Sequence, residues 1–149
     1  MSRTTWHRIG LAVIFISSVS VGAWAQLAPQ SFYDDFPGGG RVWIAVDGPY
    51  NEHLIRDVGG LNLALALVAL VAIVRPEPLL VAAAAGAALI FGAPHLLYHL
   101  LNLDVLETAD QVGVVVSLVG AVIVPLALLI DSARTLLAAD PHAGVRKLR

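Results

Sequence analysis

Apolar residues are gathered into four long blocks along this chain, and polar residues fill the intervals between them. The blocks cover about residues 9–27, 54–74, 79–101 and 111–130. Each is close to the roughly 20 residues that a helix needs to cross about 30 Å of hydrocarbon. Only a helix satisfies its own backbone hydrogen bonds in lipid over this length. The pattern predicts an all-α integral membrane protein, a four-helix bundle in which residues 1–149 form a single membrane domain.

Composition agrees with this class and excludes others. Of the 149 residues, 58% are hydrophobic and 13% are charged, whereas soluble domains carry about 25% charged residues. The net charge of −2 argues against a nucleic-acid partner, and the absence of cysteine excludes disulfides and thiolate metal sites. The partners that the sequence predicts are the lipid bilayer and either another membrane protein or further copies of this chain.

Basic residues are concentrated on one side of the predicted bundle. Seven of the nine lie before the first block, in the short turn between the second and third, or after the fourth: Arg3, Arg8, Arg75, Arg134, Arg146, Lys147 and Arg149. Eight of the eleven acidic residues lie on the other side. The positive-inside rule therefore predicts a plasma-membrane protein with both termini in the cytoplasm, an outer loop at 28–53 and a cytoplasmic tail at 131–149.

The first block also has features of a cleavable signal peptide. Arg3 and Arg8 precede the apolar run, and the sequence Ala23-Trp24-Ala25 follows it. Cleavage would leave three spans and an N-terminus outside the cell. Because Trp24 suits an interfacial anchor, we expect the segment to remain as the first span.

The outer loop combines aromatic residues with turn-forming residues. Its aromatic residues are Phe32, Tyr33, Phe36, Trp43 and Tyr50, and its turn formers lie at 37–40 and 47–49. A disordered linker would lack this density of aromatic rings. We expect an ordered extracytoplasmic loop between the first two helices, with rings that cap the bundle or enter the headgroup region. A folded cap without any chemistry is the alternative.

The third block ends with two histidines one helical turn apart. Spacings of four and then three put His95, His99 and Asn102 on one helix face, and Pro94 is expected to kink the helix just before them. Ionisable groups beside a membrane span usually face protein, water or a ligand. We therefore predict one polar cluster at the outer membrane level, in which the histidines face the bundle interior. Its members are His53, Asp57, His95, His99, Asn102, Glu52 and Asp110.

Three interpretations of this cluster stay open. The histidines bond to carboxylates without a metal, or His53, His95 and His99 hold a metal or haem, or the cluster binds a polar ligand or proton. Two histidines four apart can share one metal, but the glutamate of the His-Glu-x-x-His motif is absent and a tetrahedral site needs further donors. No catalytic residue is assigned, and the sequence requires no cofactor.

Buried polar and small residues predict how the helices pack. Asn62 lies among leucines in the second block, where an unsatisfied amide is costly, so we expect it to hydrogen-bond across helices. Small residues spaced four apart allow close helix packing, within the bundle, in a homo-oligomer or on a partner. Such rows are Gly113, Ser117 and Ala121 in the fourth block, and Ala82 and Gly86 in the third.

Four segments resemble a family of small four-span actinobacterial membrane proteins. They are SFYDDFPG at 31–38, VDGPYNEHLIRD at 46–57, PHLLYH at 94–99 and ADQ at 109–111. The architecture is also loosely similar to DoxX-like four-helix proteins. The resemblance implies the fold and topology but no assigned activity. It also implies a further histidine after the Tyr98-His99 pair, and Asn102 and Leu103 stand in that region here, which argues against a three-histidine site on this helix.

These features favour a structural or accessory membrane protein, a subunit of a larger complex, over an enzyme. One alternative is a metal- or haem-binding membrane enzyme or redox protein that uses the outer histidines. A further alternative, suggested by the kinked span and the aromatic cap, is a protein that binds a lipid or another apolar small molecule.

Overall fold

The computed structural model describes residues 2–139, and four helices in this part of the chain are long and apolar enough to cross a membrane. These helices are α1 (Arg3–Leu27), α3 (Glu52–Val74), α4 (Pro78–Leu101) and α5 (Thr108–Ala139). The shorter elements are α2 (Pro29–Asp35), the strands β1 (Pro37–Gly38) and β2 (Arg41–Val42), and the 3-10 helix η1 (Leu103–Val105). The predicted all-α fold with an ordered loop after the first helix is confirmed. The basic end of the predicted tail, 145–149, lies outside the described residues.

Two helices extend beyond the predicted spans. α1 begins at Arg3, because the side chain of Ser2 accepts a hydrogen bond from the backbone N–H of Thr5 at 3.2 Å and caps the helix. α5 continues to Ala139, so the first part of the predicted tail is helical. A helix need not end where the hydrocarbon ends, and hydropathy therefore predicts the apolar middle of a helix better than its ends.

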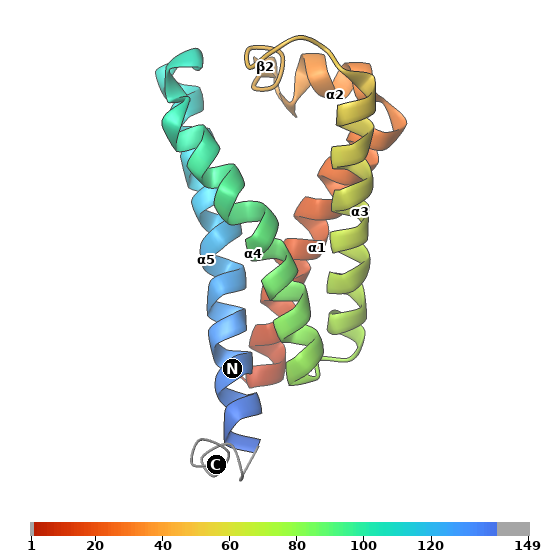
Figure 1. Cartoon of the computed structure of the whole chain (residues 1–149), viewed down its shortest axis with the longest axis vertical. Helices are drawn as coiled ribbons and strands as arrows, with labels where there is room; N and C mark the ends of the chain where they lie inside the picture. Colours follow the sequence, from red (N-terminus) through yellow and green to blue (C-terminus); the bar gives the residue numbers. More distant parts are fainter. Residues whose placement is uncertain (1, 140–149) are drawn as a thin grey trace, which may run out of the picture.

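The four long helices form two antiparallel pairs, α1 with α3 and α4 with α5 (Figure 1). Contacts within each pair far outnumber those between the pairs. We call the end with the start of α1, the α3–α4 turn and the end of α5 the termini end, and the opposite end the loop end. Figure 1 shows the two pairs close together at the termini end and separated at the loop end.

The main apolar core lies toward the termini end. It consists of Leu11, Ile14, Ala69, Ala72, Val81, Ala84, Ala85, Ala88 and Leu128. Alanines supply most of the α3 and α4 contribution, which allows these helices to approach closely. A second cluster, formed by Ala25, Phe32 and Ile55, lies at the loop end, combines residues of α1, α2 and α3, and includes no residue of α4 or α5. The main core therefore joins the two helix pairs at the termini end. At the loop end, contact between the pairs depends on the loop that connects α1 to α3.

α1 and α3 approach each other closely at two glycines, Gly22 and Gly59. A Cβ atom added at Gly59 would lie 2.9 Å from the backbone nitrogen of Gln26 and 3.1 Å from the carbonyl oxygen of Gly22. A Cβ atom at Gly22 would lie 2.9 Å from the backbone nitrogen of Leu63. Only glycine fits at these positions, because the neighbouring atoms belong to the backbone and cannot rotate away.

The prediction that Asn62 forms a hydrogen bond with another helix is wrong. The residue is buried, with 5% exposure, but its Nδ2 atom donates to the carbonyl oxygen of Val58 in its own helix at 3.0 Å. The carbonyl four residues earlier lies within reach of a short side chain. The amide donor is therefore satisfied without a second helix.

Candidate functional site

A series of aromatic rings covers the loop end of α1 and α3. The ring centroid of Trp24 lies 5.9 Å from that of Phe32 and 6.1 Å from that of Phe36, and Phe36 lies 5.9 Å from Trp43. Edge-on and tilted contacts at these distances are favourable for aromatic pairs. The rings connect α1 through α2 to the segment after β2, and they form an aromatic cap over the α1–α3 pair.

The segment 41–47, which we call the strap, connects this cap to the other helix pair. Arg41 and Trp43 both donate hydrogen bonds to Oδ1 of Asp110 in the first turn of α5, the indole nitrogen at 2.8 Å. The Trp43 ring also lies over Gly113, where an added Cβ atom would be 3.0 Å from the indole. At the far end of the strap, Asp47 accepts a hydrogen bond of 3.0 Å from the Tyr98 hydroxyl of α4. The strap therefore holds both α4 and α5 against the loop.

Local backbone geometry directs Arg41 toward α5. Gly38, the last residue of β1, and the turn residues Gly39 and Gly40 have φ values of 99°, 67° and 77°. Side-chain-bearing residues rarely adopt these angles, whereas glycine adopts them readily. The Trp43 indole and then the Arg41 guanidinium lower the pKa of Asp110, which precedes the apolar span at 111–130. The turn thus places the Arg41 guanidinium beside the Asp110 carboxylate, which stays ionised at neutral pH.

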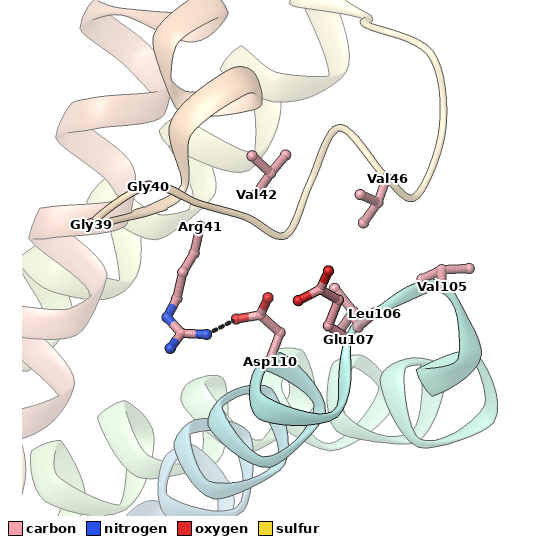
Figure 2. A pocket seen from close by; sticks show the side chains of 9 residues that line it. All are labelled: Gly39, Gly40, Arg41, Val42, Val46, Val105, Leu106, Glu107 and Asp110. Atoms are coloured by element: carbon pink, nitrogen blue, oxygen red, sulfur yellow. Dashed lines mark hydrogen bonds and ion pairs between the residues drawn. The ribbon is translucent and has the colours of Figure 1, made fainter.

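A hollow of about 450 Å³ lies between the strap and the start of α5 (Figure 2). It is lined by Gly39, Gly40, Arg41, Val42, Val46, Val105, Leu106, Glu107 and Asp110. Figure 2 shows the carboxylate of Glu107 beside the Arg41–Asp110 pair. Because Asp110 neutralises Arg41, the remaining charge is negative, and the hollow favours a neutral polar or cationic molecule over an anion.

The structure does not assemble the predicted polar cluster around the two α4 histidines. His53 lies 3.1 Å from Asp57 and Glu52 lies 2.8 Å from Arg56, both pairs along the exposed start of α3. Asn102 caps its own helix by donating to the carbonyl oxygen of Tyr98 at 2.8 Å, and Asp110 is bound to the strap. Within residues 2–139, no three His, Asp or Glu side chains are grouped as metal ligands, so the set His53, His95 and His99 is not formed. The physical reason is that α3 and α4 belong to different pairs, which separate at this end.

His95 and His99 do lie together on α4, as their spacing predicts. Their ring centroids are 4.7 Å apart, with the planes nearly perpendicular at 87°. Phe91 stacks on His95 at 5.4 Å, and the Tyr98 ring contacts His99 edge-on at 5.6 Å. Both histidines are half-buried. The hydrogen bonds of this turn come from Tyr98 and Asn102, and within residues 2–139 neither imidazole makes one.

Sequence reasoning missed a buried polar pair at the termini end. His7 is 2% exposed, and its Nε2 atom lies 2.7 Å from Oδ2 of Asp131, with Arg3 further out at 3.9 Å. The predicted spans began at residue 9 and ended at 130, which placed both partners in water. The predicted topology offered a signal for this pair, because it puts the start of the first helix and the end of the fourth at the same membrane level.

Three features of the loop end bear on function: the strap, the hollow beside it, and the histidine pair of α4. Two of them bring together residues that are far apart in the sequence, and the third uses neighbouring turns of one helix. Comparisons with models of protein families, with curated proteins and with solved structures give no match to this chain. Function is therefore inferred from the geometry of the chain itself.

Proposed function

We propose that this chain is a small accessory protein of the membrane that packs, as a subunit, against a transmembrane helix of a larger complex. The observation that carries the proposal is the exposure of α5. This helix has 32 residues, and only 17% of its most apolar stretch is buried within the chain. The corresponding share is 28% for α3 and α4 and 33% for α1. The longest spanning helix is thus the one that the chain itself covers least.

Large apolar side chains follow the exposed face of α5 at spacings of three, four or seven residues. They are Val112, Val116, Ile123, Leu126, Ile130 and Leu137. This spacing keeps the side chains on one stripe along the helix, as in left-handed pairs of packed helices. A single partner helix can contact the stripe over the whole membrane thickness.

One position of this stripe is a glycine, Gly120, which leaves space for the backbone of a partner helix. Gly120 lies between Val116 and Ile123 on the same face, and a Cβ atom added there would meet nothing within 4 Å. Transmembrane helices associate through close packing at small residues, because lipid gives them no hydrophobic driving force. Two further small residues near Gly120, Ser117 and Ala121, are exposed. Gly113 differs, because the Trp43 ring of the strap already covers it.

The proposal is tested by photo-crosslinking in cells. A photoreactive amino acid is placed at Val116 or Ile123, which are 67% and 58% exposed on α5. The matched control position is Leu67 on α3, which is 62% exposed. We expect the two α5 positions to crosslink to one and the same integral membrane protein, and position 67 to yield only lipid adducts.

A second variant makes the test specific. Gly120→Ile fills the gap in the stripe and is expected to abolish the α5 crosslinks, whereas Gly60→Ile on α3, where an added Cβ atom also meets nothing within 4 Å, should leave them intact. The partner from the crosslink should also remain with the chain in a defined ratio during purification in mild detergent. Lipid adducts alone at all three positions would contradict the proposal. Crosslinks of α5 only to a second copy of this chain would replace the subunit role with self-association.

A further inference from the structure

We propose that His95 and His99 form a two-ligand site for a divalent transition-metal ion, Cu²⁺ above all, at the loop end of α4. Imidazole is a preferred ligand of copper, nickel and zinc, and among these divalent ions Cu²⁺ binds a given nitrogen site most tightly. The two histidines belong to α4, whereas the accessory role rests on the exposed side chains of α5.

The separation of the two rings matches that of two neighbouring ligands of one ion. A metal about 2.0–2.1 Å from a ring nitrogen lies about 3.2 Å from the ring centroid. Two such rings at a ligand–metal–ligand angle of about 90–110° have centroids about 4.5–5.2 Å apart. The observed separation of 4.7 Å lies within this range. The helix thus already holds the two rings at the separation that a shared ion requires.

The two imidazoles differ from the other histidines that the structure describes. His7 and His53 are each bound to an aspartate, Asp131 and Asp57 respectively. His95 and His99 make no such pair within residues 2–139, so their nitrogen atoms are available to a metal without breaking an ion pair. A carboxylate would compete with the metal for the same nitrogen at the other two positions.

Neighbouring rings restrict the two imidazoles without occupying their nitrogens. Phe91 stacks on His95 with an interplanar angle of 20°, and Tyr98 lies edge-on against His99. Tyr98 is itself held by Asp47 of the strap. Restricting a ligand near its bound position reduces the entropy that binding must overcome. Both rings are only half-buried within the chain, so part of each imidazole is left uncovered by other residues.

Water completes the coordination of the ion in this proposal. No third His, Asp or Glu is grouped with the pair within residues 2–139. Cu²⁺ accepts a tetragonal arrangement with mixed nitrogen and oxygen ligands, so two imidazoles and bound water suffice. The site thus has open positions for an external ligand.

The test is a Cu²⁺ titration of the full chain, purified in detergent without a polyhistidine tag, followed by calorimetry and electron paramagnetic resonance. We expect one tight Cu²⁺ per chain, with nitrogen hyperfine structure from two imidazoles. His95→Gln and His99→Gln should each weaken binding by at least about tenfold, because loss of a ligand costs no less than loss of a partner that supports one. The matched controls His53→Gln and His142→Gln should bind as the wild type does. His142 lies outside the described residues.

A second measurement keeps the test independent of how well the variants fold. In the wild type, Cu²⁺ should slow the modification of His95 and His99 by diethyl pyrocarbonate, mapped by mass spectrometry, and leave that of His53 unchanged. Wild-type Cu²⁺ affinity in a well-folded His95→Gln or His99→Gln variant would overturn the proposal. So would loss of binding in His53→Gln, or equal modification rates with and without Cu²⁺.

Discussion

Replacing Gly59 with alanine is expected to destabilise the bundle, whereas the same change at the adjacent Gly60 is not. At Gly59 the new methyl group would lie 2.9 Å from the backbone nitrogen of Gln26, so α1 has to move away from α3. Overpacking of a closed interface costs about 1–3 kcal/mol, and the better helix preference of alanine offsets about 1 kcal/mol of this. At Gly60 nothing lies within 4 Å, and only the helix preference remains.

The two variants together isolate the packing contribution, because both positions lie on the same helix. Stability is measured by titrating the protein in mixed micelles with a denaturing detergent and following helical circular dichroism. The free energy of unfolding of Gly59→Ala should be lower than that of Gly60→Ala by about 1–3 kcal/mol, which is about a 5- to 140-fold difference in the folding equilibrium. Equal stability of the two variants would refute a contact between α1 and α3 that is limited by the backbone.

Two further predictions concern the topology and the strap. Single cysteines are introduced at positions 2, 31 and 144, and intact cells are treated with a membrane-impermeant thiol reagent. Position 31 should react and positions 2 and 144 should not, because most basic residues lie on the same side of the bundle as the two termini. Reaction at 144 but not at 31 would show the opposite orientation. Amide exchange across 32–46 should be slow at neutral pH. Because Trp43 and Arg41 lower the pKa of Asp110, the strap is fully stabilised above the ordinary carboxyl pKa of about 3.9 and loses this stabilisation as the pH falls through the folded-state value. Protection factors at 41–43, corrected for intrinsic exchange, should therefore fall in acid. Asp110→Asn should remove that pH dependence. Immediate exchange across 32–46 at neutral pH would instead indicate a disordered loop.

The spanning helices could be predicted because hydropathy is a local property of the chain. The predicted blocks at 54–74 and 79–101 lie within two residues of α3 and one residue of α4 at every end. The ends of α1 and α5 could not be predicted in this way, since they project past the apolar blocks and depend on capping and on contacts such as His7 with Asp131.

At the candidate site, contacts within one helix could likewise be predicted from the sequence, whereas contacts between distant segments could not. The pairing of His95 with His99 follows from helix geometry alone and is present. The expected link from these residues to His53 required the two helix pairs to stay together at the loop end, and the position of the core decides that instead. The contact of Arg41 with Asp110 joins residues 69 positions apart, and no local pattern in the sequence marks it.

The two aspartates of α5 have a consequence for the membrane in which this protein resides. Asp110 is held by the strap near one end of the helix, and Asp131 is held by His7 near the other. They are separated by about 32 Å along the helix axis at about 1.5 Å per residue, close to the roughly 30 Å thickness of the hydrocarbon. Because carboxylates avoid hydrocarbon, we expect each of the two to lie at a membrane interface. Their separation then sets the hydrocarbon thickness that fits this protein. A thicker bilayer would draw one carboxylate into lipid and strain its hydrogen bonds, and a thinner one would tilt the helix. The attachment of the loop at 28–53 is thereby coupled to the thickness of the surrounding lipid, and the protein should be most stable where that thickness matches the separation of the two carboxylates.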